Sequence, residues 1–98
     1  MRMLVLGAGL QGSACAYDLL QHTSVERVTV ADLHPDRALT LLKPHVGTRL
    51  ALVKVDARLG PALRDVMRGH DAALCALPYY FNLAVSRAAL EVGIHCAD

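Results

Sequence analysis

The sequence predicts an α/β fold in which a parallel sheet of five strands, in the order 3-2-1-4-5, is covered by helices on both faces. Short apolar segments alternate with helix-favouring segments along all 98 residues, and three early glycines are spaced G-x-G-x-x-G. Hydrophobic residues make up 54% of the chain and aromatic residues only 4%. Short connections between alternating elements imply right-handed crossovers, and an aliphatic composition is typical of a buried parallel sheet.

The first strand, over residues 3–6, leads through the three glycines into a helix over residues 13–22. Gly7 allows a sharp turn out of the strand, Gly9 has no Cβ to hold a pyrophosphate away from the backbone, and Gly12 lets the helix pack close to the strand. Free N–H groups and the positive dipole end at the helix start favour phosphate. The predicted cofactor-binding residues here are Gly7, Gly9, Leu10, Gln11 and Gly12. The alternative is a bare glycine turn between packed elements.

The second strand covers residues 27–31 and ends in Asp32, twenty residues beyond Gly12. A carboxylate at this place can accept both hydroxyl groups of an adenosine ribose, which completes the pattern of a Rossmann-type dinucleotide site. A 2′-phosphate would meet the like charge of Asp32, so NAD is favoured over NADP as cofactor. Arg37 either reaches back toward such a phosphate or belongs to the solvated face of the next helix.

The remaining elements follow from the positions of apolar runs, glycines and prolines. Helices are expected over residues 35–42, 61–68 and 82–92, with Pro44 ending the first and Gly93 the last. Strands are expected over residues 49–55, 71–77 and 94–97. After Asp71 this last-but-one strand is continuously apolar to residue 77, which predicts a central strand buried on both faces.

The predicted strand order reverses between the first and fourth strands, and a ligand should lie where their carboxyl ends meet. Cofactor contacts are therefore also expected at Ala76, Leu77 and Pro78. Asp56 and Ala57 follow the third strand and would lie near the adenine. For Asp56 a plain loop carboxylate is an equal alternative.

Residues 79–81 hold three of the four aromatic side chains, at the mouth of this crevice. They would stack on a nicotinamide or form the wall of a substrate pocket. Alternatively, they cover the end of the fourth strand or meet a neighbouring domain. No catalytic constellation is complete within the chain.

Composition excludes several other classes of function. The net charge of +1 without basic clusters gives no footprint for nucleic acid or an anionic membrane. No run is long enough to span a bilayer. Three cysteines without a CxxC pair predict buried, reduced thiols in a cytoplasmic protein. Five scattered histidines predict no metal site.

With these motifs in view, the whole chain resembles the N-terminal nucleotide-binding domain of the saccharopine dehydrogenase family. It looks closest to the L-lysine 6-dehydrogenase branch. The resemblance rests on residues 5–12, 30–32, 55–57, 69–71, 76–77 with 79–82, and 93–95 with Asp98.

The resemblance implies an amino-acid oxidoreductase that transfers hydride between a nicotinamide cofactor and an amine or imine carbon. By the same resemblance, Tyr79 and Asp98 fall where family members approach nicotinamide and substrate. A small amino-acid substrate would be bound through a second, catalytic domain outside these residues. We therefore expect an N-terminal fragment of a larger enzyme that binds its cofactor weakly or not at all, is inactive alone, and forms a homo-oligomer through exposed apolar surface.

Two other functions fit the same residues. One is a non-catalytic nucleotide-sensing regulatory module, similar to the regulatory domains of potassium-uptake systems. The other is an assembly domain with a vestigial cofactor site.

Overall fold

The computed structural model describes all residues, Met1–Asp98. Its strands are β1 (Arg2–Leu6), β2 (Arg27–Asp32), β3 (Leu50–Lys54), β4 (Ala72–Cys75) and β5 (His95–Ala97). Its α-helices are α1 (Leu10–Leu20), α2 (Leu39–Leu42), α3 (Gly60–Met67) and α4 (Asn82–Val92). Three single 3-10 turns are η1 (Pro35–Ala38), η2 (Lys43–His45) and η3 (Tyr79–Phe81).

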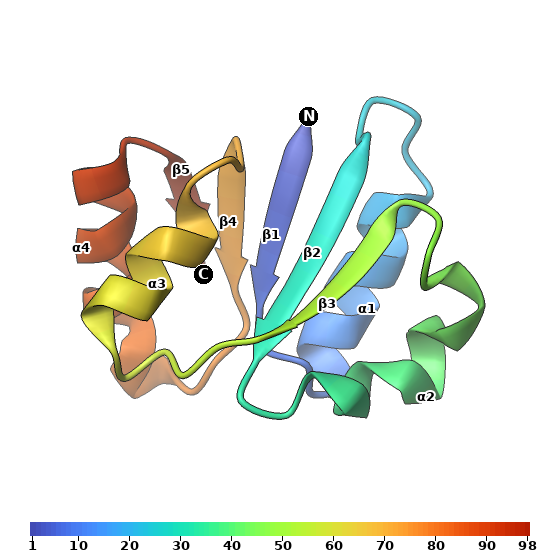
Figure 1. Cartoon of the computed structure of the whole chain (residues 1–98), viewed down its shortest axis with the longest axis horizontal. Helices are drawn as coiled ribbons and strands as arrows, with labels where there is room; N and C mark the ends of the chain where they lie inside the picture. Colours follow the sequence, from blue (N-terminus) through green and yellow to red (C-terminus); the bar gives the residue numbers. More distant parts are fainter.

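The five strands pair only in parallel, in the order β3-β2-β1-β4-β5 (Figure 1). This order confirms the predicted fold class. It places β1 at the centre, between β2 and β4, because the chain first crosses over one face of the sheet and then over the other. The carboxyl ends of β1 and β4 therefore lie side by side, with the glycine loop between them.

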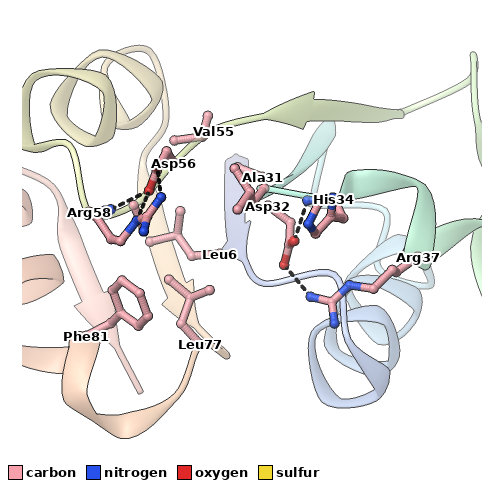
Figure 2. Close-up of a pocket in the computed structure, with 12 residues that line it drawn as sticks. Leu6, Ala31, Asp32, His34, Arg37, Val55, Asp56, Arg58, Leu77 and Phe81 are labelled. Atoms are coloured by element: carbon pink, nitrogen blue, oxygen red, sulfur yellow. Dashed lines mark hydrogen bonds and ion pairs between the residues drawn. The ribbon is translucent and has the colours of Figure 1, made fainter.

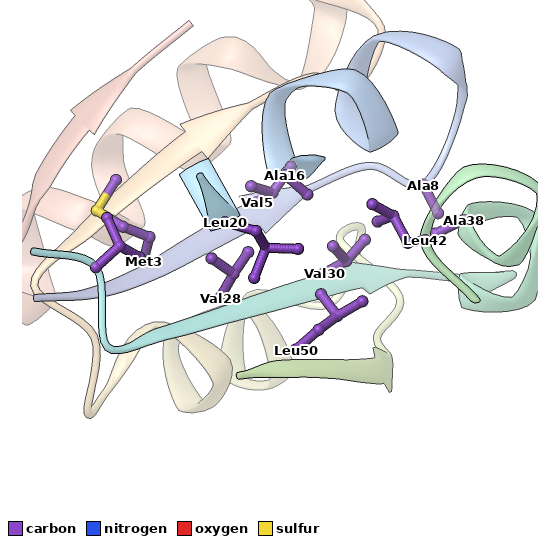
Figure 3. Packing of buried hydrophobic residues seen from close by; sticks show 11 residues of the cluster. Met3, Val5, Ala8, Ala16, Leu20, Val28, Val30, Ala38, Leu42 and Leu50 are labelled. Atoms are coloured by element: carbon purple, nitrogen blue, oxygen red, sulfur yellow. The ribbon is translucent and has the colours of Figure 1, made fainter. Parts of the chain in front are cut away.

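Helices α1 and α2 cover one face of the sheet, and α3 and α4 cover the other. Alternation along β1 shows how the two cores arise, since successive side chains of a strand point to opposite faces. Val5 packs on the α1 side with Val30 and Leu42 (Figure 3). Leu4 packs on the other side with Met67. All of these side chains are fully buried.

The prediction of a fourth strand buried on both faces is wrong. β4 covers only four residues, and its burial alternates. Ala73 and Cys75 are buried against α3 and α4, whereas Ala72 and Leu74 on the opposite face are half-buried. The helices of that opposite face lie over β1 and β2 and leave β4 partly open (Figure 1).

Two predicted helices also differ from the structure. α1 begins at Leu10, so Gly12 lies inside its first turn. The segment expected as one helix over residues 35–42 is η1, α2 and η2 in succession, and Pro44 does not end it. Pro44 lies at the start of η2, where a missing N–H and a fixed φ are tolerated. α4 ends at Gly93 with φ +87°, as expected of a left-handed helix cap.

One arginine, just before β3, forms hydrogen bonds with the end of α1 and the loop that follows it. The Arg49 guanidinium donates hydrogen bonds to the carbonyl groups of Leu20, His22 and Val25, at 3.1 Å for His22. Carbonyl groups at a helix end have no partner within the helix, so a cation stabilises them.

The three cysteines are free. Cys75 is buried and Cys15 half-buried, but Cys96 is exposed because β5 is an edge strand, so the expectation of three buried thiols is wrong. None of the helices combines the length and the apolar character needed to cross a membrane.

Candidate functional site

The glycine loop joins β1 to α1 and is held by close backbone contacts. Gly7 has φ +113°, and a Cβ at this position would lie 2.8 Å from the Ala76 carbonyl oxygen. A Cβ at Gly12 would lie only 1.9 Å from the Gly7 carbonyl oxygen. These two positions therefore require glycine for packing of the loop against α1 and the end of β4.

Gly9 differs from the other two loop glycines, because a Cβ there would meet no atom within 4 Å. It is the N-cap of α1 and makes no side-chain cap. A cavity of about 310 Å³ lies beside it, and its lining residues include Gly9, Leu10, Ser13 and Arg37. The first N–H groups of a helix lack partners within the helix, and the dipole makes this end positive. The open side of the loop thus fits a pyrophosphate.

Asp32 is the charged centre of the site and is only 5% exposed. Its Oδ2 accepts hydrogen bonds from the Ala8 amide at 2.7 Å and from Arg37 Nη2 at 2.9 Å. Its Oδ1 accepts one from the His34 amide at 2.7 Å. Burial alone would raise the pKa of Asp32, but the His34, Ala8 and Arg37 hydrogen bonds outweigh it, so the pKa is lowered overall. The carboxylate is ionised at neutral pH.

This geometry qualifies the expectation that Asp32 accepts both ribose hydroxyls. A carboxylate offers about four acceptor positions, and three are already used. Arg37 is the one partner that can move, since it is a side chain 57% exposed to solvent. It also lines both the cavity beside the glycine loop and a second cavity beyond Asp32.

The second cavity has a volume of about 330 Å³ and is mostly apolar. Figure 2 shows Asp32 and Arg37 on one side of it, with Asp56, Arg58, Leu77 and Phe81 across from them. Its size and its position at the carboxyl ends of β1, β2 and β3 fit an adenosine. Its other lining residues are Leu6, Ala31, Leu33, His34, Val55 and Ala57.

Asp56 is bound to Arg58 at the edge of this cavity. Its Oδ1 accepts hydrogen bonds from the Arg58 amide at 3.0 Å and from Nε at 2.9 Å, and its Oδ2 accepts one from Nη2 at 2.7 Å. The hydrogen bonds from the Arg58 side chain, and then from its amide, lower the pKa of Asp56 to about 2. The carboxylate is therefore engaged within its own loop.

The loop after β4 brings some of the predicted residues to the site and leaves others outside. Leu77 lines the adenosine-sized cavity, and the Ala76 carbonyl lies against the glycine loop. Pro78 is exposed and precedes η3. Of the three aromatic side chains, Phe81 reaches the cavity, while Tyr79 and Tyr80 are 84% and 69% exposed.

Asp98 follows β5, whose pairing with β4 brings it to the same edge of the sheet as Cys75. Burial raises the pKa of the Cys75 thiol, and the charge of Asp98 raises it further. The thiol donates to Asn82 Oδ1 at 3.6 Å. No cluster of three His, Cys, Asp or Glu side chains is placed to hold a metal ion.

Sequence reasoning missed Arg58 and His34 as lining residues of this cavity, and it placed Phe81 at a nicotinamide or substrate pocket instead. For Arg58 the spacing Asp-x-Arg was a usable signal, since a carboxylate and a guanidinium two residues apart can pair across a turn. His34 contributes through its backbone amide, for which the residue type carries no signal.

Comparison with known proteins agrees with this geometry. Residues 3–98 match the family model described as the saccharopine dehydrogenase NADP binding domain. The fold is similar to that of the apo saccharopine dehydrogenase (L-Glu forming) from Saccharomyces cerevisiae, with a TM-score of 0.82 and 25% identity over 97% of this chain and 20% of that chain. This chain spans about a fifth of the length of the yeast protein.

Two further structures share the fold at lower identity. One is a Rossmann-fold NAD(P)-binding family protein from Shigella flexneri, with a TM-score of 0.76 and 16% identity over 98% of this chain and 49% of that chain. The other is a short-chain dehydrogenase/reductase from Veillonella parvula in complex with NADP, with a TM-score of 0.75 and 13% identity over 98% of this chain and 45% of that chain. By its sequence match and its fold, the chain belongs to the saccharopine dehydrogenase NADP-binding domain family, a Rossmann-type nucleotide-binding domain of oxidoreductases.

Proposed function

We propose that this chain binds the nicotinamide dinucleotide of an amino-acid oxidoreductase that acts on a carbon bearing nitrogen, with L-lysine oxidised at its ε-amine. The observation that carries the cofactor part is the buried Asp32 carboxylate, which lies between the open glycine loop and the adenosine-sized cavity. The substrate part rests on membership of the family and on the resemblance of residues 79–82 and 93–98 to its lysine 6-dehydrogenase branch.

The chain's own residues provide the binding steps. The N-terminus of α1 and the bare backbone at Gly9 receive the pyrophosphate, and Asp32 accepts a hydrogen bond from the ribose. Leu77 and Phe81 exclude water from one wall of the cavity. When bound, the nicotinamide supplies hydride transfer to or from the substrate carbon.

NAD is the preferred cofactor in this proposal, as in the prediction from sequence. A 2′-phosphate beside Asp32 would meet an ionised carboxylate in a largely buried position, which is unfavourable by several kcal/mol in order of magnitude. The family's description names NADP, and Arg37 is the cation of this chain that can compensate such a phosphate. The preference for NAD over NADP therefore depends on whether Arg37 keeps its hydrogen bond to Asp32 or turns to the 2′-phosphate.

We place the catalytic acid or base on a second, substrate-binding domain. Tyr79 is the candidate for contact with the nicotinamide and Asp98 for contact with the substrate side. The high exposure of Tyr79 supports this arrangement, since a neighbouring domain would bury it. We expect the 98-residue chain to form no NADH from L-lysine. Appreciable lysine-dependent NADH formation by this chain would contradict the two-domain assignment.

Calorimetric titration of the folded chain with NAD⁺ and NADP⁺ tests the cofactor site. We expect tighter binding of NAD⁺, and an Asp32→Ala variant that loses the preference. Asp65→Ala is a matched control, because Asp65 pairs with an arginine on an exposed surface outside the cavity. Circular dichroism checks that each variant is folded. A preference unchanged in Asp32→Ala would contradict the assignment of Asp32 as the ribose carboxylate.

A further inference from the structure

Arg58 is presented at the rim of the adenosine-sized cavity in a fixed orientation. Two of its side-chain nitrogens, Nε and Nη2, donate to the two oxygens of Asp56, at 2.9 Å and 2.7 Å. Such a fork holds the planar guanidinium in one plane and reduces the entropy lost when a ligand covers it. Arg58 nevertheless remains 70% exposed, so its outer surface is free.

The surroundings of Arg58 suit a flat, uncharged ring. Leu77 and Phe81 lie on the same side of the cavity, and Val55 and Ala57 continue the apolar wall (Figure 2). A guanidinium stacks favourably on an aromatic face. The carboxylate of Asp56 accepts three hydrogen bonds from Arg58 and is only 22% exposed, so Arg58 offers the larger free surface of the pair.

We propose that Arg58 is the adenine-binding residue of the site and stacks on the base, while Asp56 is a positioning residue that holds Arg58. This inference rests on the proposed dinucleotide-binding function. It refines the expectation from sequence that Asp56 would lie near the adenine, since Arg58 and not Asp56 makes the contact. Stacking needs only the ring face, so the site should discriminate little between adenine and hypoxanthine.

The test is calorimetric titration of the chain with NAD⁺ and with nicotinamide hypoxanthine dinucleotide, whose base lacks the amino group. We expect the wild-type chain to bind the two within about 2-fold of each other. Arg58→Ala should weaken both by about 3- to 10-fold, the range expected for loss of a stacked cation. Asp56→Asn should weaken both by a smaller factor, because the fork loses its charge but keeps an acceptor.

Arg68→Ala is the matched control, since Arg68 pairs with Asp65 on an exposed surface away from the cavity. It should bind both dinucleotides as the wild type does. A proton NMR spectrum of NAD⁺ at a saturating protein concentration adds a second measurement. It would not change if Arg58 only supported the fold. In Arg58→Ala the adenine H2 and H8 resonances should shift and the nicotinamide resonances should stay unchanged.

The outcomes separate the two proposals. Unchanged NAD⁺ affinity in Arg58→Ala would overturn the role of Arg58 and leave the dinucleotide site intact. A wild-type preference for adenine above tenfold that Asp56→Asn abolishes would overturn it in favour of Asp56 as the base reader. Absence of binding of either dinucleotide by the folded wild-type chain would overturn both proposals.

Discussion

Replacing Gly12 by alanine should destabilise the fold, whereas the same change at Gly9 should not. A Cβ at Gly12 would lie 1.9 Å from the Gly7 carbonyl oxygen, more than 1 Å closer than the 3.0 Å below which neighbouring atoms must shift. The obstructing atom is backbone and belongs to a loop already held by Ala76, so α1 would have to move away from β1. Overpacking of this kind costs about 1–3 kcal/mol, and more where the neighbours cannot give way.

The helix propensity of alanine works in the opposite direction. Gly12 lies in the first turn of α1, where alanine is more favourable than glycine by about 1 kcal/mol at most. Because the obstructing atom is backbone, we take the upper end of the overpacking cost and expect Gly12→Ala to lower the free energy of unfolding by about 2 kcal/mol net. A domain of this size typically has roughly 5–15 kcal/mol in total. The variant should remain folded but less stable.

Urea unfolding followed by circular dichroism measures the difference. Gly9→Ala is the matched control, because its Cβ would occupy open space and its φ of −70° suits alanine. It should unfold within about 0.5 kcal/mol of the wild type. It should instead weaken NAD⁺ binding, since its methyl group lies where the pyrophosphate approaches. Equal stability of Gly12→Ala and the wild type, or equal destabilisation of both variants, would refute this account of the loop.

Three further outcomes follow from the structure. Arg37→Ala should lower the affinity for NADP⁺ relative to NAD⁺ by about tenfold, the loss expected for one charge-assisted hydrogen bond, and an unchanged ratio in calorimetry would rule out Arg37 as a selector. Arg49→Met should lower the free energy of unfolding by about 1–3 kcal/mol, because the carbonyl group of Leu20 at the end of α1 and two carbonyl groups of the loop after it lose their donor. Urea unfolding indistinguishable from that of the wild type would argue against this role of Arg49. Burial lowers the pKa of His70, so its contribution to stability is present above its ordinary pKa of 6.5 and is lost as pH falls through the folded value. The pKa of Asp32 is also lowered, so its contribution is present above its ordinary value of 3.8 and is lost below it. Unfolding free energies measured from pH 7.5 to 3 should therefore decline in two steps, and a His70→Gln variant should lack the first.

Much of the fold follows from local signals in the sequence. Apolar runs, glycines and prolines placed every strand and the longer helices, because each signal acts within a few residues. The helix α4 and its cap at Gly93 agree with the prediction. The type of helix in the segment 35–45 was harder to predict, since its short apolar spacing suits both an α-helix and 3-10 turns. The packing of Ala38 and Leu42 into the core selects a mixture of the two.

The candidate site was predictable in its backbone and less so in its side chains. Spacing alone identified the glycine loop and Asp32, because both are positioned by strand ends whose order the alternation determines. The partners of Asp32 were not predictable in the same way. They come from Ala8, His34 and Arg37, two of which act through backbone amides that any residue type would offer.

The class of fold, the order of the strands and the place of the crevice follow from the residues alone, since periodicity, glycine spacing and crossover handedness restrict topology. The pairing of the charged side chains in the site becomes apparent only in the folded molecule. There, Asp32 pairs with Arg37 and Asp56 with Arg58, on opposite sides of one cavity. A long, flexible side chain can pair with any group that the folded backbone places within its reach. Spacing along the chain therefore does not determine which ion pair forms.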